Sequence, residues 1–167
     1  VNMIGIMAHP LNKPVLNKQR TRVVEGYALL QPKIGVRVNY AMASAFSRTF
    51  SGQAGIEPYT NAASDIYQDT FEEGTFSGKG IYDVRVFHRI LNGIIPENSV
   101  LSHDLLEGCY SRCALATGVE LMDGYPSTVA SFFRREHRWI RGDWQLLPWL
   151  FGRDSLSLLS RWKIFDN

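Results

Sequence analysis

The sequence predicts an α/β fold. Strand-like runs of β-branched and aromatic residues alternate along the chain with segments whose apolar residues recur at helical spacing, and this alternation is typical of helices packed on a sheet. The composition agrees, because 167 residues with 45% hydrophobic and 20% charged content are enough to bury one ordinary core. We therefore expect one domain, or most of one, over residues 1–167.

The first elements are a helix and a turn. Residues 1–8 are typical of the end of an amphipathic helix, and Pro10 and Pro14 then interrupt regular structure. Residues 22–31, RVVEGYALLQ, predict a strand that Pro32 stops, with residues 34–39 as its candidate partner strand.

Helices and loops are predicted for the middle of the chain. Helical spacing of apolar residues predicts helices over 41–50 and 84–91, and a short helix over 61–71 after a Gly/Pro loop at 51–58. Between them, the glycines of GTFSGKGIYD (residues 74–83) indicate that the backbone passes close to a ligand or to another element.

The last third predicts a helix over 104–117, with Ser102 or His103 near its N-cap and Gly118 at its end. A short strand over 119–122 follows. Ser127 or Thr128 is then expected to cap a helix that runs to Arg141 and stops at Gly142.

Composition also excludes some functions. The net charge of +2, from 18 basic and 16 acidic residues, is too even for a dedicated nucleic-acid binder. No run approaches the roughly 18 consecutive apolar residues that span a bilayer. The two cysteines, Cys109 and Cys113, are predicted to be reduced and buried. The chain begins without Met and stops in mid-pattern, so we expect it to be a segment of a larger protein.

SHDLLEG (residues 102–108) is the first candidate for chemistry. Asp104 and Glu107 lie three residues apart at a predicted helix start, where free amides and the helix dipole stabilise a carboxylate anion. Asp104 can therefore serve as an ionised base. Acidic residues also occupy first turns simply as caps, so the sequence leaves both interpretations open.

The second candidate for chemistry is FFRREHRWIRGDWQ (residues 132–145). Arg134, Arg138 and Arg141 share one helical face and can hold a diphosphate through forked hydrogen bonds, although a solvated basic face would look the same. The neighbouring Trp139 and Trp144 favour a ligand, because a flat aromatic surface offers a platform to a sugar ring.

The remaining motifs carry less chemistry. The amides and Lys79 of GTFSGKGIYD are available to an anionic or hydroxyl-rich ligand, but the segment is not a Walker loop. The histidines show no metal-ligand spacing, so we expect no metal site built from this chain alone. Residues 146–167 are amphipathic, which suits a membrane surface or packing against neighbouring segments, and packing is favoured.

Five strings together resemble the family-2-like glycosyltransferase domain of cyclic β-1,2-glucan synthases: MAHPLNKPV, RVVEGYALLQPKI, GTFSGKGIYDV, ENSVLSHDLLEGCYSR and REHRWIRGDWQLLPWL. The resemblance implies the C-terminal, acceptor-side half of a glycosyltransferase-A fold, with a short mixed sheet flanked by helices. Such a domain inverts configuration as it transfers glucose from UDP-glucose to a growing β-1,2-glucan.

The resemblance also implies roles for single residues. HD of SHDLLEG stands where these enzymes carry their general base, which implies Asp104. REHRW resembles their Q-x-x-R-W motif, although Arg135 replaces the leading Gln. This implies Arg135 and Arg138 at the donor diphosphate and Trp139 at the acceptor. It likewise places three further residues beside the acceptor: Gly78, Lys79 and His103.

The metal-binding D-x-D of this fold is absent from the chain. Mg²⁺ or Mn²⁺ is therefore expected to be held by residues upstream of Val1, and the isolated chain is not expected to catalyse transfer. The implied partners are UDP-glucose, a glucan acceptor, and the remaining domains and transmembrane helices of a larger protein, on the cytoplasmic face of the bacterial inner membrane.

Two other functions remain open on sequence alone. In a noncatalytic carbohydrate- or nucleotide-binding module, the same arginines and tryptophans would suffice and Asp104 would only cap its helix. In a glycoside phosphorylase or hydrolase, a second carboxyl group or a phosphate site would be required, and no second constellation supplies it.

Overall fold

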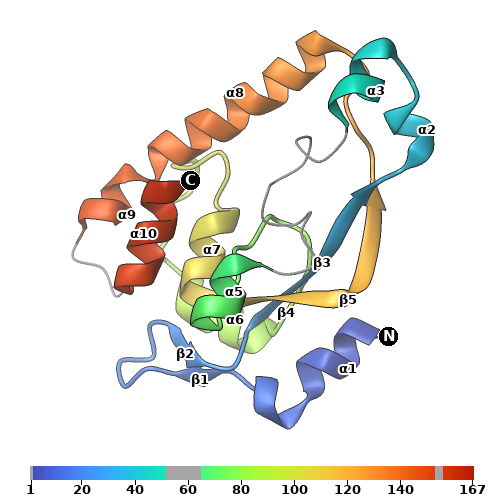
Figure 1. Ribbon diagram of the computed structural model, residues 1–167. Coiled ribbons are helices and arrows are strands. Elements are labelled where there is room, and N and C mark those ends of the chain that lie inside the picture. Colours follow the sequence, from blue (N-terminus) through green and yellow to red (C-terminus); the bar gives the residue numbers. More distant parts are fainter. Residues whose placement is uncertain (1, 52–64, 153–155) are drawn as a thin grey trace.

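The computed structural model describes residues 2–51, 65–152 and 156–167 (Figure 1). The helices are α1 (Asn2–Ala8), the 3-10 helix η1 (Pro10–Asn12), α2 (Val38–Ala41), α3 (Ala45–Phe50), α5 (Ile66–Phe71), α6 (Val84–Leu91), α7 (Asp104–Ser111), α8 (Val129–Gln145), α9 (Leu147–Phe151) and α10 (Leu158–Asp166). The strands are β1 (Val15–Leu16), β2 (Val23–Glu25), β3 (Leu29–Val36), β4 (Ile81–Tyr82) and β5 (Cys113–Asp123).

The described strands form a small hairpin and a small mixed sheet. β1 pairs antiparallel with β2, and a three-stranded sheet has the order β4-β3-β5. Its central strand β3 runs antiparallel to β4 and parallel to β5. Figure 1 shows this sheet between α1 on one side and α5, α6 and α7 on the other, with the long helix α8 crossing the molecule from α3 to α9. The predicted α/β class, with a short mixed sheet flanked by helices, is confirmed.

The strand predicted over 22–31 is wrong in its boundaries. Gly26, with φ of +63°, separates β2 from β3, and a Cβ there would lie 2.0 Å from the Lys13 carbonyl oxygen. Pro32 lies inside β3, opposite Ala116 of β5 and beside a bulge. β4 pairs with β3 only at Leu29 and Leu30, so no partner on that side needs the missing N–H of Pro32.

The predicted partner strand over 34–39 is also wrong. Its first three residues continue β3, and α2 begins at Val38. The helix predicted over 41–50 is divided at Ser44, whose side chain accepts a hydrogen bond from the Ser47 amide in a capping box and begins α3 there.

The helix predicted over 104–117 ends early. α7 stops at Ser111, and Arg112 adopts a φ of +52°. The next residues are strand, because the Cys113–Ala116 backbone pairs with Leu29–Pro32 of β3. Tertiary pairing overrides helical spacing here. The strand predicted over 119–122 is confirmed as the second half of β5.

Thr128 caps α8 as predicted, but α8 passes through Gly142 and ends at Gln145. The predicted helix over 84–91 is confirmed as α6, and α1 confirms the one over 1–8. α5 confirms the helix predicted over 61–71 from Ile66 onward, behind an Asp65 N-cap. Residues 52–64 of this helix and of the predicted 51–58 loop lie outside the described residues.

The main core packs α6 and α7 against the C-terminal helices. The largest of its fully buried side chains are Ile90, Leu106, Tyr110 and Leu146. Within the described ranges, no helix combines the length and the apolar character needed to cross a bilayer.

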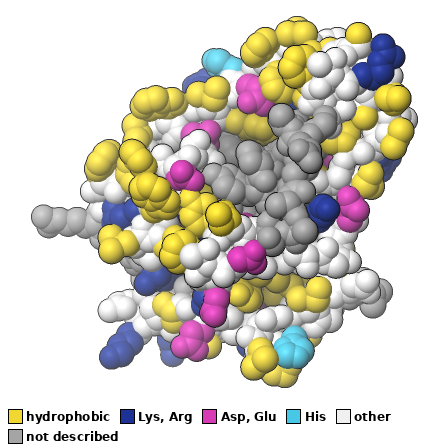
Figure 2. Space-filling model, viewed as in Figure 1, with side chains coloured by type: hydrophobic (Ala, Val, Ile, Leu, Met, Phe, Trp, Pro, Cys, Tyr) yellow, Lys and Arg dark blue, Asp and Glu magenta, His cyan; other side chains and the backbone are white. Residues whose placement is uncertain are grey.

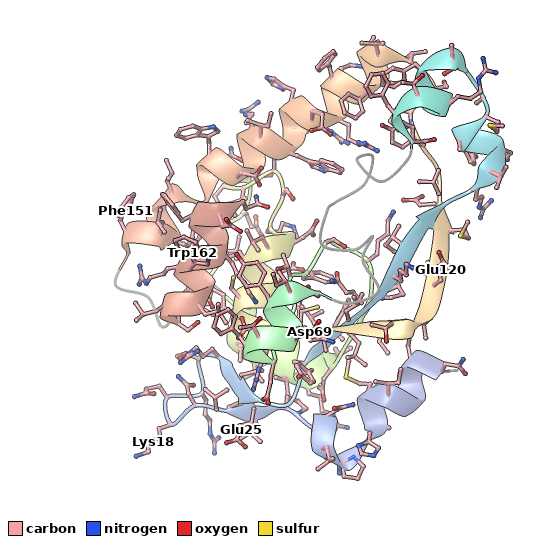
Figure 3. All side chains as sticks on the ribbon, in the orientation of Figure 1. Lys18, Glu25, Asp69, Glu120, Phe151 and Trp162 are labelled. Atoms are coloured by element: carbon pink, nitrogen blue, oxygen red, sulfur yellow. The ribbon has the colours of Figure 1, made fainter. Side chains whose placement is uncertain are left out.

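One surface stays apolar. Figure 2 shows hydrophobic side chains gathered along the edge where α8, α9 and α10 lie. Its exposed members are Ile140, Trp144, Leu147, Phe151, Leu158, Trp162 and Phe165. Phe151 and Trp162, labelled in Figure 3, come from α9 and α10. Residues 146–167 therefore have two apolar faces. One is exposed at this edge, and the other is buried in the core through Leu146, Leu156 and Ile164.

Candidate active site

Hydrogen bonds of the Gln31 side chain hold the loop over residues 74–79 against the central strand of the sheet. This β3 side chain is fully buried. Its amide nitrogen donates to the Thr75 carbonyl, and its oxygen accepts from the Ser77 amide at 3.0 Å and the Ser77 hydroxyl at 3.1 Å. Because both ends of the Gln31 amide are used, the loop has little freedom to shift along the strand.

Two glycines bring this loop against α7. A Cβ on Gly78, whose φ is +90°, would lie 2.5 Å from Asp104 Oδ2, and a Cβ on Gly108 would lie 2.8 Å from that of Phe76. The carboxylate of Asp104 therefore faces the backbone of Gly78. The predicted close approach of the Gly-rich segment is confirmed, and the neighbouring element is α7.

A third glycine brings α8 against the residues that precede α7. A Cβ on Gly142 would lie 2.9 Å from Ser102 Cβ. One turn later on the chain, the Gln145 side chain accepts a hydrogen bond of 2.8 Å from the Leu101 amide. α8 is thereby held close to the start of α7, with Trp139 on the side that faces Asp104.

Two adjoining cavities lie where these three elements meet. The first, of about 300 Å³, is lined by Ile34, Ser77, Gly78, Lys79, Asp104, Asp123, Gly124, Arg135 and Trp139, and we call it the basic cavity. The second, of about 360 Å³, is lined by Thr75, Phe76, Ser77, Ser102, Asp104, Leu105, Trp139, Asp143, Asp166 and Asn167, and we call it the acidic cavity. Asp104, Ser77 and Trp139 line both, so they stand at the junction.

The carboxyl group of Asp104 is partly buried at this junction. Burial raises its pKa above the ordinary value, while the charge of His103 and a hydrogen bond from Ser102 lower it by less. The direction is opposite to the one expected from a helix start, where free amides favour the anion. Desolvation outweighs them. When ionised, Asp104 is therefore a stronger base than an exposed aspartate.

His103 and Glu107 form a separate pair beside Asp104. The Nδ1 atom of His103 lies 2.6 Å from Glu107 Oε1, and burial raises the pKa of Glu107. His103 is half-exposed and lines neither cavity. Although it holds the N-cap position of α7, its side chain makes no capping hydrogen bond.

Arg135 is held by aromatic rings at the wall of the basic cavity. Its guanidinium carbon lies 4.7 Å from the ring centre of Trp139 and 5.4 and 5.5 Å from those of Tyr125 and Phe132. Stacking on several rings fixes the plane of the guanidinium group. Arg138, by contrast, is exposed and lines neither cavity.

Lys79 contributes charge to the same cavity. Its ammonium group forms an ion pair with Asp123, the last residue of β5. The pair joins the Gly-rich loop to the end of the strand that runs parallel to β3. The structure thus brings together five of the predicted site residues: Gly78, Lys79, Asp104, Arg135 and Trp139.

Sequence reasoning missed several residues that line these cavities. Asp123, Asp143 and Thr75 were not singled out, and the role of Gln31 in holding the loop was not expected. Asp143 could have been found, because it follows Trp139 by four residues and so shares its helical face. Gln31 gave no such signal, since a buried amide inside a strand has no pattern of its own.

Among the described residues, one group has the composition of metal ligands. His103, Asp104 and Glu107 offer atoms within 4.8 Å of one another. In the structure His103 and Glu107 contact each other directly. We assign this group no metal, since the contacts that it makes are within the protein.

Comparison with known proteins agrees with the resemblance seen in the sequence. The chain is 49% identical, over 167 residues and 99% of its length, to a protein of Rhizobium meliloti (strain 1021) described as "Cyclic beta-(1,2)-glucan synthase NdvB". It spans 6% of the length of that relative. No family model matches the chain. The chain is therefore related to one segment of a cyclic β-(1,2)-glucan synthase, and the kind of domain to which that segment belongs stays a prediction.

Proposed function

We propose that this chain, as a relative of one segment of a cyclic β-(1,2)-glucan synthase, is the acceptor-side part of an inverting glucosyltransferase. It would take part in transferring glucose from UDP-glucose to a growing β-1,2-glucan. One observation carries the proposal: Asp104, Arg135 and Trp139 line the same cavity, although α7 supplies the first and α8 the other two.

In the proposed reaction, Asp104 is the general base. An acceptor hydroxyl donates its proton to the Asp104 carboxylate while its oxygen attacks the anomeric carbon of the donor glucose from the face opposite the diphosphate. The bond between that carbon and the phosphate oxygen breaks, and its electron pair leaves with the diphosphate. Attack from the opposite face inverts the α-linked donor to a β-linked product.

The residues of the basic cavity suit the leaving group. Arg135, held flat by its rings, offers forked hydrogen bonds to phosphate oxygens and stabilises the charge that develops there. Lys79 adds a second cation, shared with Asp123. We propose Arg138 as an outer contact of the diphosphate, because it is exposed on α8 beyond the cavity wall.

Trp139 is the proposed platform for the acceptor sugar, with Gly78 in the same cavity wall. His103, half-exposed at the start of α7, is proposed as an outer contact of the acceptor. A divalent cation, Mg²⁺ or Mn²⁺, held by carboxylates outside this chain, would neutralise diphosphate charge when bound. The chain is therefore not expected to catalyse transfer without the rest of its domain.

The remaining partners are proposed from the relative and from the surface. The apolar edge of α8, α9 and α10 exposes several aromatic side chains, which fits burial against further segments of a larger, membrane-associated protein. We place that protein at the cytoplasmic face of the bacterial inner membrane, where sugar nucleotides are available.

The test is Asp104→Asn in the complete enzyme that contains this segment. Loss of a general base should lower glucosyl transfer from UDP-glucose at least ~100-fold and leave UDP binding unchanged, because the amide keeps the shape of the side chain. The matched control is Asp69→Asn, an exposed aspartate on α5 (Figure 3), which should have full activity.

The result also separates the proposal from its alternative. A noncatalytic carbohydrate- or nucleotide-binding module would tolerate Asp104→Asn, so appreciable turnover in this variant would exclude Asp104 as the base. The anomeric configuration of the new linkage is a second readout, and retention of configuration would contradict a single displacement.

A further inference from the structure

The two cavities at the junction differ in charge. The basic cavity is lined by two cations, Lys79 and Arg135, and by two carboxylates, Asp104 and Asp123, the second of which is paired with Lys79. Among the described residues, the acidic cavity is lined by three aspartates, Asp104, Asp143 and Asp166, and by no lysine or arginine. A diphosphate can pair with the cations of the first cavity, whereas the aspartates of the second repel it. The acidic cavity instead suits a neutral ligand with many hydroxyl groups, each able to donate to a carboxylate.

Asp143 is the aspartate best placed for this role. It follows Trp139 by four residues on α8, so the two side chains lie one turn apart on the same face and line the same cavity. Gly142 sets this face close to Ser102. A flat ring beside a carboxylate is a suitable pair for one sugar unit, because the ring packs on its apolar face while the carboxylate binds its hydroxyl groups.

Thr75 gives an independent sign of a ligand. It is 8% exposed and lines the acidic cavity, yet its Oγ1 atom has no hydrogen-bond partner among the described residues. A buried hydroxyl without a partner is uncommon and unfavourable. A ligand hydroxyl or a water in the cavity would supply the missing bond.

We propose that the acidic cavity is a subsite for a glucosyl unit of the acceptor, in which Asp143 binds sugar hydroxyl groups. This unit would lie one step away from the unit whose hydroxyl reaches Asp104. The inference rests on the proposed function, and it adds Asp143 and Thr75 as residues that bind the acceptor rather than the donor.

The experiment measures binding of a short β-1,2-linked gluco-oligosaccharide and of UDP to the complete enzyme, by calorimetry in the presence of EDTA. In Asp143→Ala, loss of a charge-assisted hydrogen bond should weaken oligosaccharide binding about 10- to 100-fold and leave UDP binding unchanged. Thr75→Val, which keeps the shape of the side chain, should weaken the oligosaccharide alone by a smaller factor. Asp69→Ala on α5 is the control.

Unchanged oligosaccharide affinity in Asp143→Ala would overturn the subsite, and so would a wild-type enzyme that binds no oligosaccharide. If Asp143→Ala weakened UDP binding instead, the cavity would belong to the donor. EDTA removes divalent cations, so an effect seen only when Mg²⁺ is restored would assign the aspartates to a cation. Failure of the proposed function is separate: Asp104→Asn would keep its turnover whatever the oligosaccharide affinity of the Asp143 variant.

Discussion

At the scale of single residues, Asp104 shows how position and environment can oppose each other. The sequence places it at a helix start, which favours the anion, and the structure buries it, which raises its pKa. A base with a raised pKa takes up a proton more readily, but the protein loses stability by holding the charged form in a partly buried place. The burial that makes this carboxylate a stronger base therefore also lowers the stability of the folded chain.

The stability of the folded chain should therefore depend on the pH at which Asp104 ionises. Since the pKa of Asp104 is higher in the folded than in the unfolded chain, its contribution to stability is present below the ordinary carboxyl pKa. It is lost as the pH rises through the raised value. Asp104→Asn removes the buried charge, and we expect a melting temperature roughly 2–4 °C above wild type at neutral pH.

Thermal denaturation followed by circular dichroism checks this expectation, with Asp69→Asn as the control. The difference between Asp104→Asn and wild type should shrink to nothing near pH 3, where both side chains are neutral. An Asn variant less stable than wild type at pH 7 would show that the carboxylate contributes favourable contacts that outweigh its burial.

Five residues that the sequence predicted for the site lie together in the structure, and their roles in binding and catalysis stay predictions. Asp104, Arg135, Trp139, Gly78 and Lys79 were all expected at one site, and they line one cavity. Arg138 was expected with them but faces solvent. Helical spacing alone could not decide between Arg135 and Arg138, since they are three positions apart and only the packing of α8 selects the buried face.

At the scale of elements, three glycines set how closely the parts of the site approach. Gly142 was predicted to end α8, but it stands inside the helix because Ser102 leaves no space for a side chain. Glycine in a helix interior is unfavourable by itself, so its presence here is explained by packing rather than by helix termination.

Gly142→Ala should therefore destabilise the protein although alanine is the better helix former. The new Cβ would lie 2.9 Å from Ser102 Cβ, and moving α8 away to accommodate it should lower the free energy of unfolding by ~1–3 kcal/mol. Urea denaturation of the purified chain measures this loss.

Gly5→Ala is the matched control for Gly142→Ala. Gly5 also lies inside a helix, α1, and a Cβ on it would meet nothing within 4 Å. Only helix propensity should then act, and we expect a gain of up to ~1 kcal/mol. If both alanine substitutions stabilised the protein alike, α8 would be able to move away from Ser102 without loss of stability.

Most of the wrong boundaries lie where strands pair, and the helix predicted over 104–117 also ends early because its last residues join β5. Local spacing predicted α6 and α8 well, because an amphipathic helix carries its own period. β3 and the first half of β5 are paired and buried together, and burial on both faces removes the alternation that marks a strand. Pro32 was misread for the same reason, since only the sheet order shows that its nitrogen needs no partner.

At the scale of the whole molecule, one buried ion pair connects the C-terminal helix to the site loop. Lys163 of α10 is 3% exposed, and its ammonium group donates to Glu73 Oε1 at 3.0 Å, the Glu73 carbonyl at 2.9 Å and the Gly74 carbonyl at 3.0 Å. The ring of Tyr67 lies 5.4 Å from the same nitrogen. Residues about ninety positions apart are thus joined at the point where the Gly-rich loop begins.

The buried ammonium group of Lys163 has all its hydrogen bonds. Removing it should therefore lower the free energy of unfolding by more than the ion pair contributes. Lys163→Met removes the cation and leaves the Glu73 carboxylate buried without compensation, so we expect a loss of ~3–5 kcal/mol in the free energy of unfolding. Lys18→Met, at an exposed lysine near β1 (Figure 3), is the control and should change little.

A double substitution distinguishes two causes of that loss, the uncompensated charge of Glu73 and the lost hydrogen bonds to backbone carbonyls. Adding Glu73→Gln to Lys163→Met removes the uncompensated charge, and the pair should then recover part of the stability lost by Lys163→Met alone in urea denaturation. If no recovery occurs, the carbonyl contacts of Lys163, rather than its charge pairing, hold α10 on the loop. In either case the Thr75–Gly78 segment begins next to the Gly74 carbonyl that Lys163 binds, so α10 contributes to the placement of the Gly78 backbone against Asp104.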